Sequence, residues 1–546
     1  MTIPGQPFPL LRLPLPPMAL ALMALAFALP GLAGHDLWKS HDAIGLGIVH
    51  EMARTGELIV PRVAGHLWLN DPPLYHWTAL AFGSAFRYFL EFHSAVRLAS
   101  GAFMLAGFWL AYRAARDWIP AQDRSASASA GMLLLLGSVG LMVHAHEAVP
   151  ELATLAALCG AFATLAAAAT RPLAAGAGFG LALGAALASS SWVAPAALFI
   201  AVLAAHFVHP AWRTRRAPLF LGAGALVALL TGSLWPAALG LRSPELLAQW
   251  WAAASQTEGG FAAGLRYFIN ACGWFAWPAW PLALWALWSG RRRWREPQLF
   301  VPALAIVLML PGLAAWGQRQ SVTLIPILAP FVMLAVQGVP TLRRGAAAAL
   351  DWFGLVTFAF FGGLVWLGYV AMLTGVPPRV AQNFFRNAPG FVPEFNAFLF
   401  LLALALSSVW IYLMFFTAYS PTRSIARWAA GIVLLWGTAA SLWMPWVDYQ
   451  KSYRSVALQL RSRIPVNTAC IAQRGLGVPQ AASLDYYADI RPRPFDFGKP
   501  RECPLLLVQG SPQHEFDAPG AGWTKLADLG RPGDRNERLR LYRSAK

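Results

Sequence analysis

Three stretches of the sequence gather the side chains that could carry out chemistry. The first, residues 35–77, is rich in acids, histidines and aromatic residues, although 57% of the chain is hydrophobic. The second reads HAHEAVPE at 144–151, and the third reads GQRQS at 317–321. Carboxylates and imidazoles can move protons, and arginine can hold a phosphate through two hydrogen bonds. If the three stretches meet in space, we expect proton transfer beside a bound anion.

Metal chemistry and the chemistry of common soluble enzymes are not indicated. The sequence contains no HExxH, GxSxG or CxxC motif and no phosphate-binding loop. His144 and His146 are two residues apart, a spacing that points two side chains to different faces of a helix. We therefore expect neither a bound metal nor a cofactor.

Membrane-spanning helices must position these residues. The chain has 546 residues, of which 12% are charged, and a mean hydropathy of +0.50. Apolar runs near the roughly 18 to 20 residues that cross a bilayer recur along residues 1–446. We predict an all-α polytopic membrane bundle of about thirteen transmembrane helices. The run at 18–34 is interpreted as an uncleaved first helix, with a signal peptide as the alternative.

Arginines separate the apolar runs and fall on alternate loops. Cytoplasmic loops carry the excess of Lys and Arg, so these loops and the N-terminus should lie in the cytoplasm. The opposite loops then face outward, and they include a large first loop at about 35–95 and a second at about 237–272. All three polar stretches fall on this outer side. The arginines concerned are Arg113, Arg116, Arg124, Arg171, Arg213, Arg215, Arg216, Arg291, Arg292, Arg293, Arg295, Arg343, Arg344, Arg423 and Arg427.

Two apolar segments are assigned particular roles. Residues 74–92 could be mistaken for a crossing, but counting them as one would place every later arginine loop outside. We interpret this segment as a helix in the outer interface. Glycines at 176, 180 and 184 have the spacing that lets two membrane helices approach closely.

The last hundred residues change character. From about 447 to 546 polarity rises, with a helical pattern at 452–463 and short strand-like runs at 468–472, 504–509 and 539–543. We predict a small α/β domain on the outer side. Of the four cysteines only Cys470 and Cys503 lie in this domain, where an oxidising compartment allows a disulfide between them.

The net charge of +17 does not indicate nucleic-acid binding. The basic residues occur as small groups between apolar runs and form neither a stripe nor a tail. The expected partners are membrane lipids, a lipid-linked substrate and its acceptor. The oligomeric state stays open.

The first outer loop also resembles a known family. Its order of motifs is LWKSHD at 37–42, EMARTGELIVP at 51–61 and PPLYHW at 72–77. This order resembles the first outer loop of bacterial lipid-linked sugar transferases of the C type (GT-C), the group that includes the lipid A aminoarabinose transferase and the protein O-mannosyltransferases. Weaker similarity continues at EAVPELATLAAL (147–158) and at QRQSVTLIPILAPFVMLAV (318–336). The number of spans, the large outer loops and the outer tail also match, so the resemblance covers nearly the full length.

The resemblance implies a membrane glycosyltransferase. Such an enzyme transfers a sugar from a polyprenyl-phosphate donor to a lipid, glycan or protein acceptor at the periplasmic face of the bacterial inner membrane. Neither a nucleotide sugar nor a cofactor is needed. A base that deprotonates the acceptor and a cation that screens the leaving phosphate would together suffice.

The site residues that the resemblance implies depart from the family pattern. His41 and Asp42 stand where the family has an Asp-Glu pair, so Asp42, assisted by His41, or else Asp36, is the expected catalytic base. Asn70 and Asp71 stand where it has Glu-Lys, and two further lysines are missing. The candidates for substrate binding are therefore Arg54, Arg62, Asn70, Asp71, Glu147, Glu151, Arg266 and Arg319, with Lys39 as a further cation.

Several of these residues have structural alternatives. Asp71, followed by Pro72, could cap the next helix. Glu147 and Glu151 would share one helix face and could bind acceptor hydroxyls or a cation, or could be solvated acids at a helix start. The tryptophans that could either stack on a sugar or anchor the loop at the interface are Trp38, Trp68 and Trp77.

Two other functions remain as alternatives to a glycosyltransferase. The altered acidic pair and the missing lysines would also suit a transferase-like protein that binds a lipid-linked sugar without catalysis. A lipid or solute transporter would usually show polar residues at mid-bilayer and repeated halves, and the sequence indicates neither. The sugar and the acceptor are not specified by the sequence.

Overall fold

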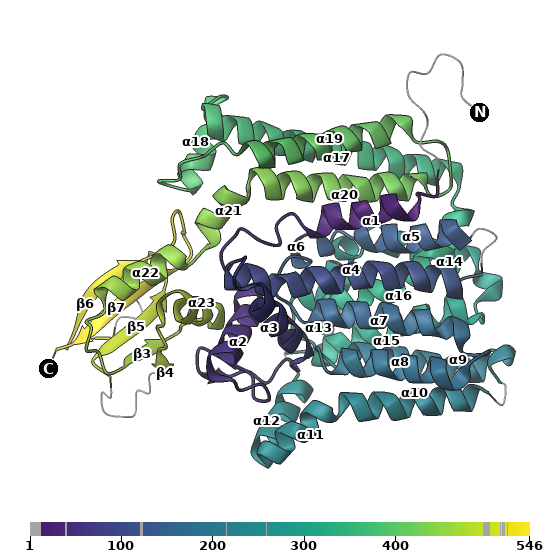
Figure 1. Ribbon diagram of the computed structural model, residues 1–546, viewed down its shortest axis with the longest axis horizontal. Helices are drawn as coiled ribbons and strands as arrows, with labels where there is room; N and C mark the ends of the chain where they lie inside the picture. The colour runs from purple at the N-terminus through teal and green to yellow at the C-terminus, as the bar shows by residue number, and fades with distance from the viewer. Residues whose placement is uncertain are drawn as a thin grey trace.

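The computed structural model describes residues 13–38, 41–120, 124–213, 216–257, 259–494, 503–513, 515, 519–520 and 522–545. Long helices lie side by side in a bundle, and a small sheet lies beyond one end of it (Figure 1). We call the end of the bundle next to this sheet the domain end. Helices α2 and α3 lie at the domain end, between the bundle and the sheet (Figure 1).

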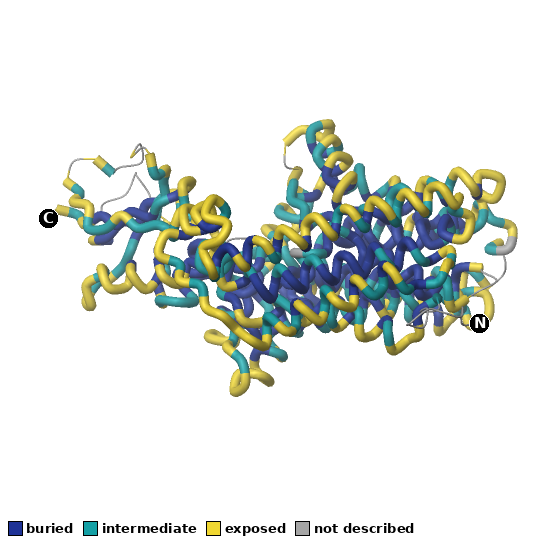
Figure 2. The backbone as a smooth tube through the Cα atoms, turned by 90° about the horizontal axis from the view of Figure 1, so that it is seen from above, coloured by how far each residue is buried: buried dark blue, intermediate teal, exposed yellow. Residues whose placement is uncertain are grey.

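The bundle is built from apolar helices whose buried residues form one large core. Buried residues run through the centre of the bundle, while its outer faces carry many exposed residues (Figure 2). Exposed leucines such as Leu226, Leu229 and Leu230 on one helix suit a lipid environment. The helices are α1 (Pro17–Ala28), α4 (Phe92–Trp118), α5 (Arg124–Leu136), α7 (Glu151–Thr164), α8 (Pro172–Leu187), α9 (Val193–Val208), α10 (Ala217–Gly232), α13 (Phe261–Phe275), α14 (Ala279–Ser289), α15 (Pro297–Trp316), α16 (Leu328–Gly338), α17 (Arg344–Thr374), α19 (Ala397–Phe416) and α20 (Arg423–Leu442).

Seven helical segments of the described chain are long and apolar enough to cross a membrane. Four shorter apolar helices, α1, α7, α8 and α9, lie among them, with α7 continued as far as Ala167. The structure thus confirms a mostly helical chain with several membrane-spanning helices. The total of about thirteen crossings stays a prediction.

The three spaced glycines lie at the contact between α8 and α10. A Cβ atom on Gly176 would lie 2.4 Å from the carbonyl oxygen of Phe220, and one on Gly180 would lie 2.3 Å from that of Gly224. Both distances are too short for any side chain, so glycine is needed for the two backbones to approach this closely. The predicted role of these glycines in helix packing is confirmed.

The first outer loop folds into two helices and a hairpin. It comprises α2 (His41–Thr55), the strands β1 (Arg62–Val63) and β2 (His66–Leu67), and α3 (Leu74–Phe86). Helix α3 has 13 residues, too few to cross a bilayer, which agrees with its interpretation as an interfacial helix. Helix α2 packs so closely on the second stretch that a Cβ atom on Gly45 would lie 1.9 Å from the carbonyl oxygen of Ala148.

Short helices occupy the remaining connections. At the domain end, α11 (Leu234–Arg242) and α12 (Pro244–Ser255) stand beside the first loop (Figure 1). Others include α6 (Leu141–His144), the 3-10 helix η4 (Ser321–Ile327), α18 (Pro378–Asn387) and α21 (Met444–Lys451).

The C-terminal region forms a five-stranded mixed sheet with two helices. The strand order is β4-β3-β5-β7-β6, in which β3 pairs in parallel with β4 and β5, while β7 pairs antiparallel with β5 and β6. Three strands and one helix lie close to the segments that the sequence pattern predicts. The elements are α22 (Arg454–Arg463), β3 (Ile471–Arg474), α23 (Val478–Ala488), β4 (Arg493–Pro494), β5 (Leu505–Gly510), β6 (Trp523–Leu529) and β7 (Arg538–Ser544).

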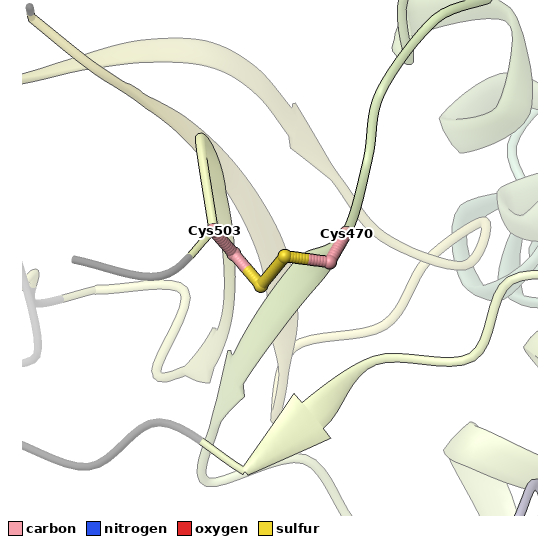
Figure 3. Close-up of a disulfide and its surroundings, with 2 residues drawn as sticks. All are labelled: Cys470 and Cys503. Atoms are coloured by element: carbon pink, nitrogen blue, oxygen red, sulfur yellow. A yellow bond between two sulfur atoms is a disulfide. The ribbon is translucent and has the colours of Figure 1, made fainter.

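The predicted disulfide between Cys470 and Cys503 is present (Figure 3). It joins the residue before β3 to the segment before β5, two strands that are neighbours in the sheet. Helix α23 of the same region packs on α2, where a Cβ atom on Gly47 would lie 2.9 Å from the Cβ atom of Ala482. The C-terminal region therefore contacts the first outer loop directly.

Candidate active site

A cavity of about 260 Å³ lies where the three polar stretches meet. Its wall combines the start of α2, the turn before α3, the start of α7, α12 and the turn between α15 and η4. The sequence-based expectation that the three stretches converge is met. The polar side chains on its wall belong to His41, Asn70, Asp71, His76, Glu151, Ser190, Ser191, Gln318 and Thr323.

His41 is the first residue of α2 and lines the cavity. Gln320 of the third stretch lies close to its ring, and the charges of Asp71 and Glu147 act on it. Burial lowers the pKa of His41 below its usual value, and the two acids only partly offset this effect. The imidazole is therefore neutral at neutral pH and able to accept a proton.

Asp71 lines the same cavity as His41. One of its carboxylate oxygens accepts a hydrogen bond of 2.8 Å from the indole nitrogen of Trp68. Burial raises the pKa of Asp71, against the opposing effects of Trp68 and His41. The alternative that Asp71 caps α3 is wrong, because Pro73 occupies the N-cap position and no side chain makes a capping bond there.

Glu147 links the second stretch to the third through His144. The Nδ1 atom of His144 lies 2.7 Å from a carboxylate oxygen of Glu147, and its Nε2 atom lies 3.0 Å from the hydroxyl of Ser321. Glu147 itself is buried behind the cavity wall formed by Ala148 and Pro150. Glu151, the first residue of α7, lines the cavity.

His76 is a cavity residue that the sequence analysis did not select. It is fully buried on α3, and neither ring nitrogen has a hydrogen-bond partner among the described residues. Burial lowers the pKa of His76 to about 3. A buried imidazole without a partner is unfavourable by several kcal/mol, about the transfer cost of an unpaired polar group. A ligand hydroxyl, which can both donate and accept, could pair with one of the two ring nitrogens.

Asp42 lies behind the cavity and does not line it. It is fully buried, and its carboxylate accepts hydrogen bonds of 2.9 and 2.6 Å from the guanidinium of Arg97 on α4. A third bond of 3.0 Å comes from the backbone N–H of Ala148. Burial opposes ionisation of Asp42, but Arg97 outweighs it and holds the pKa of Asp42 below its usual value. This geometry suits a residue that fixes the start of α2.

Asp36 also lies outside the cavity, on the side of the C-terminal region. Its carboxylate accepts a hydrogen bond of 2.7 Å from the hydroxyl of Ser452, and a nitrogen of Arg454 lies 3.3 Å away. Neither Asp36 nor Asp42 is therefore placed to take a proton from a substrate held in the cavity.

The predicted arginines do not line the cavity. Arg54 pairs with Glu51 at 2.6 Å, and Arg62 and Arg319 donate to backbone carbonyls at 3.1 and 3.0 Å. Arg266 is exposed on α13. Lys39 lies outside the described residues. Within the described part of the wall, no side chain is Arg or Lys.

Lys451 is a basic residue near Glu147, outside the cavity wall, that the sequence analysis did not select. It ends α21, and its ammonium group lies 4.5 Å from the ring centre of Trp38. Its charge also interacts with that of Glu147. Some three hundred residues separate Lys451 from Glu147 along the chain, so no local pattern could have joined them.

Aromatic rings form much of the remaining wall. The ring of Trp68 lines the cavity, whereas the indole nitrogen of Trp77 donates a hydrogen bond to the carbonyl of Leu58. Trp side chains present broad apolar faces and a polar edge, which suits contact with sugar rings. The tryptophans that line the cavity are Trp68, Trp192, Trp250, Trp251 and Trp316.

Comparison with solved structures reveals the fold. The chain is similar to ArnT from Cupriavidus metallidurans bound to undecaprenyl phosphate, with 18% identity, a TM-score of 0.67, and coverage of 96% of this chain and 97% of that one. The apo structure of the same protein matches with 18% identity, a TM-score of 0.67 and coverage of 97% and 98%. The oligosaccharyltransferase AglB from Archaeoglobus fulgidus matches with 11% identity, a TM-score of 0.45 and coverage of 90% and 68%.

No protein-family model and no curated protein sequence matches the chain. The structural match nevertheless spans almost the whole of both chains, with the helical bundle and the C-terminal sheet together. The chain therefore has the same fold as ArnT over nearly its whole length.

Proposed function

We propose that this protein transfers a sugar from a polyprenyl-phosphate donor to a hydroxyl group of an acceptor. The observation that carries the proposal is the cavity that His41, Asp71 and several tryptophans line. The charges of Asp71 and Glu147 act on His41 there. The fold supports it, because a chain of the same fold has been seen with undecaprenyl phosphate bound. The acceptor is a lipid, a glycan or a protein.

The reaction takes place at the periplasmic face of the bacterial inner membrane in this proposal. Two observations support that side. The arginine-bearing loops alternate with the polar stretches along the chain, as the cytoplasmic excess of positive charge requires. The cavity also lies at the domain end, near a region with a disulfide, and disulfides persist in the periplasm.

His41 is the proposed base. The acceptor oxygen attacks the anomeric carbon of the sugar, the bond from that carbon to the phosphate oxygen breaks, and the polyprenyl phosphate leaves with the bonding electrons. The acceptor proton moves to a ring nitrogen of His41. The nearby carboxylates of Asp71 and Glu147 then stabilise the imidazolium ion that forms.

The leaving phosphate requires a positive charge nearby. Lys451 is the proposed cation, because it is the basic side chain whose charge acts on Glu147 beside the cavity. Its place on Trp38 keeps the ammonium group at the domain end. His76 is proposed to bind a hydroxyl of the sugar, and Glu151 and Asn70 to line the acceptor path.

Asp42 acts in this proposal as a positioning residue. Its buried ion pair with Arg97 holds the first turn of α2, and His41 is the neighbouring residue of that turn. Asp36 similarly ties the loop to the C-terminal region. We therefore propose His41 as the base in place of these two acids, because His41 lines the cavity and they do not.

A binding protein without catalysis is the second candidate. The observation that favours it is the absence of Arg and Lys from the described wall of the cavity, since a leaving phosphate is normally screened by a cation. The two functions differ in one respect that can be measured. Only an enzyme would depend on a residue that accepts a proton.

The test compares surface glycans by mass spectrometry. A strain lacking the protein should lose a defined sugar mass that the wild-type chain restores and His41→Ala does not. His66→Ala is the matched control, because His66 is an exposed histidine of the same loop whose ring contacts the carbonyl of Pro492. Full restoration by His41→Ala, at equal protein level, would remove His41 from the mechanism and favour the binding protein.

A further inference from the structure

A second cluster of polar groups lies away from the cavity, where the first loop, α4 and the C-terminal region meet. It consists of Asp36, which precedes α2, and of Glu91 and His93 at the start of α4. One donor atom from each of the three side chains lies within 4.8 Å of the other two. Residues from two separate segments thus place one nitrogen and two carboxylate oxygens around a common point.

The spacing of these atoms approaches that of a metal site. Zinc bonds of about 2.0–2.2 Å in a tetrahedron place neighbouring donor atoms about 3.3 Å apart. The Nε2 atom of His93 already lies 3.2 Å from a carboxylate oxygen of Glu91. Asp36 needs to approach by about 1.5 Å at most to complete a three-residue set, with water in the fourth position.

The ring of His93 is held in the orientation that a ligand requires. Its Nδ1 atom lies 3.1 Å from the hydroxyl of Tyr486 on α23, so the Nε2 atom faces the two carboxylates. Metal-binding histidines usually have their second nitrogen fixed in this way. The hydroxyl of Ser452 likewise holds one oxygen of Asp36 at 2.7 Å.

Within the described part of the chain, the carboxylate of Glu91 has one ion-pair partner, the ring of His93. Glu91 stands at the N-cap position of α4, yet its side chain makes no capping bond. The side chain is 61% exposed, whereas that of His93 is 3% exposed. An ion could therefore enter from solvent past Glu91 and reach a buried imidazole.

Arg454 would compete with a metal ion for the carboxylate of Asp36. A guanidinium nitrogen lies 3.3 Å from one oxygen of Asp36, but the side chain is half exposed. The long, half-exposed side chain of Arg454 can rotate away from Asp36 into solvent when a doubly charged ion binds. The repulsion between Arg454 and the ion weakens binding without blocking it.

We propose that Asp36, Glu91 and His93 bind one divalent transition-metal ion, with Zn²⁺ the best match to the donor set. Imidazole nitrogen and carboxylate oxygen are both zinc ligands, and the small ligand number disfavours Ca²⁺. The ion joins the first outer loop to α4, and through Tyr486 and Ser452 it braces the C-terminal region against them. This site is independent of the proposed glycosyl transfer.

The test uses Zn²⁺ itself and the full-length protein in detergent. Protein stripped with EDTA is titrated with Zn²⁺ in competition with a chromophoric chelator, and its melting temperature is measured with and without the ion. The wild type should bind one ion with higher affinity than any other site and gain thermal stability. Glu91→Gln and His93→Gln should each weaken this binding at least tenfold and lose the gain.

Two controls make the result decisive. Glu57→Gln changes an acid of the same loop that pairs with Arg242, and His66→Ala removes an exposed histidine, so both should bind Zn²⁺ like the wild type. Glu91→Gln alters an exposed side chain and should fold normally, which keeps the test informative if His93→Gln does not fold. Wild-type protein that binds no ion, or Glu91→Gln that binds as tightly as the wild type, would overturn the proposal.

Discussion

The ion pair between Asp42 and Arg97 provides the sharpest test of the site. Both side chains are 0% exposed, and two hydrogen bonds of 2.9 and 2.6 Å join them. In Asp42→Asn a neutral amide replaces the carboxylate. The buried guanidinium of Arg97 is then left without a counter-ion. Removing one partner of a buried pair typically destabilises a protein by about 3–5 kcal/mol. We expect a loss of this size in the free energy of unfolding.

The assay is a double-mutant cycle on purified protein in detergent. Unfolding is followed for the wild type, Asp42→Asn, Arg97→Gln and the double variant. Because the double variant leaves neither charge buried alone, it should be less destabilised than the sum of the two single variants by about 2 kcal/mol or more. The cycle isolates the interaction from the loss of either side chain.

The same cycle separates a structural role from a catalytic one. If Asp42 were the base, Asp42→Asn would abolish activity at unchanged stability, and the coupling with Arg97 would be near zero. That result would refute our interpretation of Asp42. The sign of the pH dependence agrees with the structural role: the pKa of Asp42 is lowered in the folded protein, so its contribution is present above the unfolded value and is lost as the pH falls through the folded value.

Three further outcomes are expected. Because burial lowers the pKa of His41, activity should persist at neutral pH and fall in acid as the ring takes up a proton; a rate profile flat from pH 7 down to pH 4 would contradict this. Lys451→Ala should weaken binding of undecaprenyl phosphate several-fold, whereas Lys525→Ala, on the far sheet, should leave the affinity measured by titration unchanged. Reducing the disulfide between Cys470 and Cys503, which are 33 residues apart, should destabilise the C-terminal region by about 3–4 kcal/mol in chemical unfolding, and a change below about 1 kcal/mol would contradict the loop-closure argument.

The sequence by itself determined the overall plan of this protein. Apolar runs, arginine-bearing loops and spaced glycines are local signals, so the helical bundle and a close helix contact at the spaced glycines could be predicted from them, whereas the structure identified α10 as the partner of α8. The strand-like runs and the cysteines of the tail likewise predicted its sheet and its disulfide. The polar stretches are also local signals, and they identified the region of the cavity.

Only the tertiary structure decided which polar residues face the cavity. His41 and Asp42 are neighbours at the start of one helix, where successive side chains point about 100° apart, so one lines the cavity while the other turns to the core. The partner that draws Asp42 inward is Arg97, 55 residues away within an apolar helix. Lys451 and His76 could likewise be identified only from the structure. Whether a charge is paired, or a ring is left without a partner, depends on contacts between distant segments.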